Sequence, residues 1–172
     1  ETVANFNNEF FAKRPDMLDY PTDIFNSAKN GATSFHCSEE LWQNPLDINT
    51  DMTPEQYNQI KTGWDFLIDI DSPFLDYSKI AARLIIKALE YNGVKNIGIK
   101  FSGSKGFHII IPFKAFPKQI GTDEDAIQVK DKFPEYPRLI AQYIGDLIHD
   151  KLAEEIIAVS PLSEKKEMFE II

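Results

Sequence analysis

Two carboxylates one residue apart end an apolar run near the middle of the chain. The run covers residues 63–71 (GWDFLIDID), and Asp69 and Asp71 close it. If the run is a strand, Phe66, Ile68 and Ile70 face one way, and Leu67, Asp69 and Asp71 face the other. Two anions held close together repel each other unless a cation lies between them, and Mg²⁺ or Mn²⁺ is commonly held by carboxylates plus substrate phosphates. The pattern indicates a divalent-metal site for phosphate chemistry, although an Asp pair at a strand end is also typical of a turn or a helix cap.

A second group of polar residues lies in a glycine-containing loop at residues 101–108 (FSGSKGFH). Alternating apolar residues on both sides, at 97–101 and 107–111, predict a β-hairpin. Glycines let a backbone approach a ligand and offer amides to an anion, while serine hydroxyls and a lysine add donors and charge. The residues expected to contact phosphate are Ser102, Gly103, Ser104, Lys105 and His108. His108 faces away from the apolar side of its predicted strand, which favours the same side as the aspartates; an ordinary glycine hairpin is the alternative.

Hydrophobic periodicity, helix-capping residues, glycines and prolines predict the elements that would position these groups. Helices are expected at 22–28 after a Thr22 cap, from a Thr53 capping box to Gly63, at 77–91 after an Asp76 cap, and at 137–158 from Pro137. A further strand is expected at 32–37, and 122–131 reads as an irregular charged segment. His149 falls on the polar face of the last helix, and Ser160-Pro161 ends that helix before what looks like the start of another element. Strands and helices alternate around a hairpin, which predicts an α+β fold with a mixed or antiparallel sheet flanked by helices.

Length and composition narrow the class of protein. A chain of 172 residues with 43% hydrophobic residues fits one folded domain. The net charge of −9 argues against a broad basic surface for duplex DNA, but five lysines between residues 95 and 118, with no acid among them, suit either a solvated surface or a local phosphate-binding patch. The single cysteine, Cys37, excludes an internal disulfide and a cysteine-rich zinc site, and we expect it to be buried in a cytoplasmic protein. No apolar run is long enough to cross a bilayer, so no membrane partner is expected.

The combination of motifs resembles a known family. A strand with Asp-x-Asp, then a helix, then a hairpin carrying Ser-Gly-x-x-Gly-x-His is similar to the small catalytic subunit of archaeal and eukaryotic DNA primase and to the wider primase-polymerase superfamily. The phrases at 40–45 (ELWQNP) and 136–138 (YPR) resemble flanking segments of that family. The resemblance implies an RRM-like catalytic core and template-directed nucleotidyl transfer, in which primers are made or DNA or RNA is extended from nucleoside triphosphates.

The resemblance also assigns roles to residues. It implies that Asp69 and Asp71 hold two divalent ions, Mg²⁺ or Mn²⁺, and that Ser102 and His108 contact the triphosphate with help from the Gly103 backbone. We add Lys105 because of its charge. The implied partners are a nucleoside triphosphate, a single-stranded DNA template or primer-template, and a primase large subunit or a helicase. No zinc is expected, because no cysteine follows the first motif.

The sequence departs from the family in two respects. Many members of the family carry a Cys/His zinc knob after the first motif, and this chain has no cysteine there. The family carries a third carboxylate on a later strand, whereas four later aspartates of this chain lie in a predicted loop or helix: Asp123, Asp125, Asp146 and Asp150. We therefore interpret residues 1–172 as a fragment of a single primase-polymerase catalytic domain, with a lead-in at 1–31 and a core at 32–172 that lacks the final strand.

Two other functions fit parts of the pattern. A haloacid-dehalogenase-type phosphatase also uses an Asp-x-Asp strand, with Asp69 as nucleophile and Asp71 as acid/base, but it expects Thr or Val where this chain has Pro73. A primase-like domain that binds a nucleotide or a partner with an incomplete catalytic set is the non-enzyme alternative.

Overall fold

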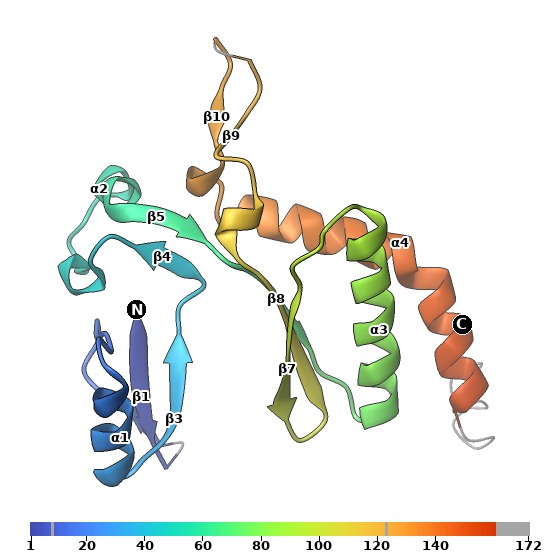
Figure 1. The fold of residues 1–172 in the computed structure, drawn as a ribbon, viewed down its shortest axis with the longest axis horizontal. Coiled ribbons are helices and arrows are strands. Elements are labelled where there is room, and N and C mark those ends of the chain that lie inside the picture. The colour runs from blue at the N-terminus through green and yellow to red at the C-terminus, as the bar shows by residue number, and fades with distance from the viewer. Residues whose placement is uncertain (8, 123, 161–172) are drawn as a thin grey trace. The chain divides into compact units, whose positions relative to one another are not determined.

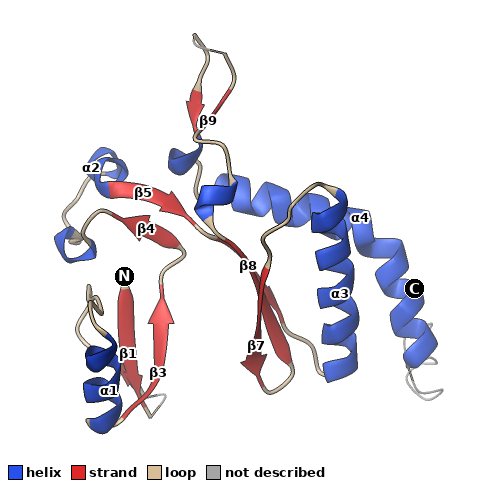
Figure 2. Cartoon of the chain, in the orientation of Figure 1, coloured by secondary structure: helices blue, strands red, loops and turns tan. Residues whose placement is uncertain are grey.

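The computed structural model describes residues 1–7, 9–122 and 124–160. Contacts divide the chain into two compact units where the sequence led us to expect one domain. The first unit comprises residues 1–65 and 116–133, and the second comprises residues 66–115 and the described residues from 134 onward. Both units contain helices and strands (Figure 2).

The first unit begins with a three-stranded antiparallel sheet in the order β2-β1-β3. Its elements are β1 (Thr2–Phe6), β2 (Phe10–Phe11), α1 (Pro21–Lys29) and β3 (Ala32–Cys37). Strand β3 confirms the expected strand, and its pairing with β1 makes the lead-in part of a folded sheet. Thr22 lies inside α1 and does not cap it. Instead, the Asp23 carboxylate accepts hydrogen bonds from the amides of Asp19 and Tyr20.

The rest of the first unit is built around Trp64. Its elements are β4 (Glu40–Trp42), η1 (Pro45–Asp47), α2 (Pro54–Ile60), β5 (Lys61–Trp64), β9 (Gln119–Ile120), β10 (Ile127–Gln128) and η3 (Val129–Asp131). The indole of Trp64 is fully buried, and its Nε1 donates to the carbonyl of Val129 at 2.9 Å. A strand near residue 64 and a short helix near residue 130 are thereby fixed to each other.

Two sequence expectations about this unit need correction and one is confirmed. The Thr53 capping box forms, with the Thr53 amide donating to Gln56 Oε1 at 2.8 Å. Helix α2 ends at Ile60, however, and Gly63 lies within β5. The segment at 122–131, which was expected to be irregular, contains β10 and η3, and Ile127 of β10 pairs with Ile120 of β9.

The apolar run at 63–71 is two strands and not one. Strand β5 pairs with β4, whereas the next strand, β6 (Phe66–Ile70), pairs with β8 in the second unit. Asp65 separates them, and its amide donates to the carbonyl of Glu39 at 2.8 Å. The chain therefore changes pairing partners at Asp65.

The second unit holds both predicted motifs. Its elements are β6, α3 (Leu75–Tyr91), β7 (Gly98–Gly103), β8 (Gly106–Ile111), η2 (Phe113–Ala115) and α4 (Glu135–Val159). The strand order is β6-β8-β7, with both pairings antiparallel, so β6 and β7 run parallel with β8 between them. Helices α3 and α4 lie side by side (Figure 1). The hairpin expected around residues 102–106 is confirmed as β7–β8.

The core of this unit lies between one face of the sheet and the helices. Phe66, Ile70, Ile109 and Ile111 are buried on the sheet, and Leu84, Ile85, Ala88 and Leu89 are buried on α3. Ile144 and Ile148 are buried on α4. Helix α3 contacts both β6 and β8, and α4 contacts β6. Burying these apolar side chains holds one face of the sheet against helices and leaves its polar face for other contacts.

The helix ends differ in detail from the sequence expectations. Helix α3 begins at Leu75, so Asp76 lies in its first turn and does not cap it. Helix α4 begins at Glu135, two residues before Pro137, because proline is tolerated in a first helical turn. It ends at Val159, next to the expected break. The element expected after Ser160-Pro161 lies outside the described residues.

The remaining sequence expectations concern the fold class and the exposure of single residues. The α+β class is confirmed, but every strand pairing in the described residues is antiparallel, in four small sheets and not one mixed sheet. Cys37 is exposed and not buried, since it ends β3. His149 is exposed, as expected. No helix in the described part of the chain is long and apolar enough to cross a membrane.

Candidate metal and phosphate site

The strand register brings the two motifs together on one face of the second unit's sheet. Asp69 of β6 lies directly opposite His108 of β8, and Leu67 lies opposite Ile110. Residues directly opposite each other in an antiparallel pair point to the same face. The expectation that His108 shares a face with the Asp-x-Asp strand is therefore confirmed for Asp69.

The contact between these side chains is close and accessible. His108 Nε2 lies 3.4 Å from Asp69 Oδ1, with 28% of the histidine side chain and 65% of the aspartate side chain exposed. Asp71 is also exposed and follows the last residue of β6. A carboxylate and an imidazole this close together can both bind one ligand.

A third strand adds a positive charge to the same face. Lys100 of β7 lies directly opposite His108, on the other side of β8 from Asp69. The side chains of Asp69, His108 and Lys100 therefore form a row across the sheet. Sequence reasoning did not single out Lys100 as a site residue, although it precedes Ser102 by two residues, which is the spacing of a shared strand face.

The hairpin tip is a tight turn. Gly103 pairs with Gly106, and the backbone has positive φ at Gly103 (+109°) and at Ser104 (+52°). Apart from its chain neighbours, no atom of the described residues lies within 4 Å of where a Cβ on Gly103 would be, so that stretch of backbone is open to a ligand. Ser102, Ser104 and Lys105 are all exposed. The tip therefore presents hydroxyl groups and backbone, as the sequence predicted, and its role in binding phosphate stays a prediction.

Lys105 has a contact that the sequence did not indicate. Its Nζ donates to the carbonyl of Pro73, in the turn that follows Asp71. In this arrangement the lysine ties the hairpin tip to the end of the Asp-x-Asp strand. A structural role thus accompanies the phosphate-binding role that we predicted for it.

The hydroxyl groups of Ser72 and Ser78 also hold this turn in place. Ser72 Oγ donates to the carbonyl of Phe74 at 2.6 Å and lies 2.9 Å from Ser78 Oγ, which is fully buried in α3. The turn after Asp71 is thereby anchored to the start of α3. Sequence reasoning missed this pair, because a serine inside a helix usually faces solvent or its own backbone.

Gly106 permits the close approach of β6 and β8. A Cβ on Gly106 would lie 2.8 Å from the carbonyl oxygen of Ile70 and 2.5 Å from Ser102 Oγ. The Ile70 carbonyl belongs to the backbone immediately before Asp71. A glycine is needed here so that the hairpin can lie against the end of the metal motif.

The residues present fit a metal site that substrate completes. No group of three or more His, Cys, Asp and Glu side chains that could hold an ion occurs in the described residues. Asp69 and Asp71 supply two carboxylates, and Mg²⁺ is usually held by one or two carboxylates together with waters and substrate phosphates. When bound, such an ion supplies charge neutralisation and polarisation of a phosphoryl oxygen. Asp69 and Asp71 would hold it, and His108 would donate a hydrogen bond to a phosphate oxygen.

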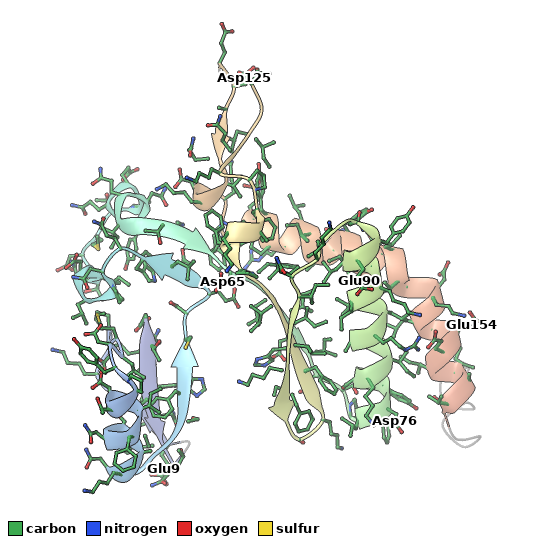
Figure 3. The ribbon with its side chains drawn as sticks, viewed as in Figure 1. Glu9, Asp65, Asp76, Glu90, Asp125 and Glu154 are labelled. Atoms are coloured by element: carbon green, nitrogen blue, oxygen red, sulfur yellow. The ribbon has the colours of Figure 1, made fainter. Side chains whose placement is uncertain are left out.

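The later aspartates have the contexts expected for them. Asp125 lies at the β9–β10 hairpin, in the first unit, as Figure 3 shows. Asp146 and Asp150 lie on α4, where Asp150 contacts His149. Asp123 is outside the described residues. None of the three described aspartates lies on a strand, so they do not provide the strand-borne third carboxylate.

Comparison with known proteins finds a similar archaeal sequence. No family model matches the chain, and no solved structure matches it. The chain is similar to an uncharacterized protein of Methanocaldococcus jannaschii, with 33% identity over 122 residues. That match covers 67% of this chain and 26% of the relative, so the chain spans about a quarter of the relative's length. The similarity places a related sequence in an archaeon and carries no activity with it.

Proposed function

We propose that this chain is the metal- and nucleotide-binding part of a template-directed nucleotidyltransferase of the primase-polymerase type. The observation that supports this most is the pairing of Asp69 with His108, which joins the Asp-x-Asp and Ser-Gly-x-x-Gly-x-His motifs on one sheet face. The two motifs are separated by a whole helix in sequence, so only the fold can bring them close together. Phosphoryl transfer needs such a meeting, because the anionic triphosphate must be neutralised and aligned.

Each residue of the site has its own role in binding the metal or the nucleotide. Asp69 and Asp71 hold Mg²⁺ or Mn²⁺ together with the phosphates of the incoming nucleotide, and His108 and Ser102 donate hydrogen bonds to phosphate oxygens. The exposed Gly103 backbone adds an amide donor. These groups bind and orient the triphosphate; a template strand selects the base.

The topology of the second unit supports the proposal. Its element order β6-α3-β7-β8-α4, with the strand order β6-β8-β7, corresponds to the first five elements of a ferredoxin-like β-α-β-β-α-β unit. In the described residues β6 pairs with β8 alone, which leaves its other edge for a further strand. A carboxylate on such a strand would complete the metal site of the proposed enzyme.

The end of α4 is held against the first turn of α3. Ser160 is buried, and its hydroxyl lies 2.6 Å from the hydroxyl of Tyr77 in the first turn of α3. That turn follows Asp71 closely in sequence. Helix α4 therefore ends near the turn that follows β6.

A binding domain without catalysis is the second candidate. It is favoured by the lack of any three-ligand metal group in the described residues. Template-dependent incorporation of nucleotides would separate the two candidates, because a binding domain would bind nucleotide and add none. The phosphatase alternative is weaker, because Pro73 follows the motif and β6 pairs antiparallel.

The proposal is tested by equilibrium binding of a labelled nucleoside triphosphate with Mn²⁺ and with chelator. Wild type is expected to bind only with Mn²⁺. Asp69→Asn and His108→Ala should each raise the Kd by about tenfold or more, because each removes a charge-assisted contact to phosphate or metal. Asp146→Asn, an exposed carboxylate on α4, is the matched control and should bind like wild type.

Two results would count against the proposal. Binding that ignores the metal and both variants would show that the nucleotide binds elsewhere. An Asp146→Asn variant as weak as Asp69→Asn would show that bulk negative charge, and not this sheet face, attracts the metal.

A further inference from the structure

We propose that Lys100 is a further phosphate-binding residue of the site. In this arrangement the phosphates of the nucleotide lie across the strands, from the metal-binding end at β6 to Lys100 on β7. This inference rests on the proposed function and adds a residue and a direction for the bound phosphate chain. By sequence alone, Lys100 is one of five scattered lysines.

The register carries the first step of the argument. Lys100 lies opposite His108, and His108 lies opposite Asp69. Neighbouring strands are about 4.8 Å apart, so the backbones that carry Asp69 and Lys100 are separated by about 10 Å. Side chains that point to the same face from such a separation can reach the two ends of one polyphosphate.

The two lysines near His108 differ in their side-chain contacts. Lys105 donates to the Pro73 carbonyl at the hairpin tip. Lys100 is exposed, and its side chain has no hydrogen bond or ion pair with any residue that the structure describes. It lies within the paired part of β7, so its backbone is fixed by the sheet. Lys100 is therefore the lysine whose backbone is fixed by the sheet and whose side chain is available to a ligand.

The third step is the order of charges along the row. Asp69 is an anion that suits a metal, His108 is a hydrogen-bond donor when it carries a proton on Nε2, and Lys100 is a cation. A metal-bound triphosphate has the matching order, because the metal neutralises one part of the phosphate chain and leaves negative charge on the rest. Lysine binds phosphate as a point charge and needs no fixed orientation.

The experiment measures the Kd of nucleoside mono-, di- and triphosphates in the presence of Mn²⁺. Lys100→Ala is expected to raise the triphosphate Kd by about tenfold and to change the monophosphate Kd much less, since one charge-assisted contact to the phosphate chain is lost. Lys100→Arg should restore most of the affinity because it keeps the charge. Lys95→Ala, an exposed lysine just before β7, is the matched control and should change no Kd by more than about twofold.

The outcomes separate this inference from the proposed function. If Asp69→Asn weakens Mn²⁺-dependent binding but Lys100→Ala matches wild type for all three nucleotides, the inference is wrong and the function stands. Equal losses in Lys100→Ala and Lys95→Ala would also overturn it, because general charge would then explain both. If wild type binds no nucleotide with Mn²⁺, the proposed function and this inference fail together.

Discussion

Replacing Trp64 by alanine is expected to lower the free energy of unfolding by about 4 kcal/mol. The indole is fully buried, its ring centroid lies 4.9 Å from that of Phe116, and its Nε1 donates to the Val129 carbonyl. Truncation to alanine leaves a large cavity and removes the donor. Urea unfolding followed by far-UV circular dichroism measures the loss without relying on tryptophan fluorescence.

A second substitution at the same position separates packing from hydrogen bonding. Trp64→Phe keeps an aromatic ring but leaves the Val129 carbonyl without the indole donor, so we expect a loss of about 2 kcal/mol. A phenylalanine variant as stable as wild type would contradict the role of the hydrogen bond. An alanine variant within about 1 kcal/mol of wild type would contradict the burial of this side chain.

Gly106→Ala is expected to cost about 2 kcal/mol and to weaken Mn²⁺-dependent nucleotide binding as well. The new methyl group would lie 2.8 Å from the Ile70 carbonyl oxygen, a backbone atom that cannot rotate away. Strand β8 would have to move from β6 at the end where Asp69 and His108 pair. The same urea experiment and the nucleotide-binding experiment measure both effects.

Two control variants isolate the cause. Gly145→Ala on α4 adds a methyl group where nothing lies within 4 Å, and alanine favours helix, so it should stabilise by about 1 kcal/mol. Combining Gly106→Ala with Ser102→Ala removes the clash with Ser102 Oγ but not the one with Ile70. The double variant should keep most of the stability loss. Full recovery would mean that the serine, and not the strand β6 backbone, requires a glycine here.

The polar face of the second unit could be predicted because a strand alternates its side chains. Asp69 and His108 each lie between two apolar residues. Because those apolar neighbours are expected to face the core, Asp69 and His108 are expected on the opposite face of the sheet, and this follows without knowledge of the fold. The hairpin was predictable for the same reason, with glycines marking its turn. These features depend on local pattern alone.

Other features depend on partners that are distant in sequence. The break at Asp65 arises because β5 and β6 pair with β4 and β8, and the apolar run gives no sign of the change. Lys100 and Lys105 look alike in sequence, yet one lies opposite His108 and the other bonds to Pro73. The expectation for Cys37 was wrong because it followed the average burial of cysteine, whereas this cysteine lies at the exposed end of β3.

The most direct test of the proposed site is to locate bound Mn²⁺ by NMR. In a ¹⁵N-labelled sample with a non-hydrolysable nucleoside triphosphate, added Mn²⁺ should broaden the amide signals of Asp69, Asp71 and His108 first, and Asp69→Asn should abolish that selectivity. Signals around His149 and Asp150 on α4 serve as the internal reference. Broadening that begins on α4, or that is the same with and without the nucleotide, would contradict a metal and triphosphate site on the face shared by Asp69 and His108.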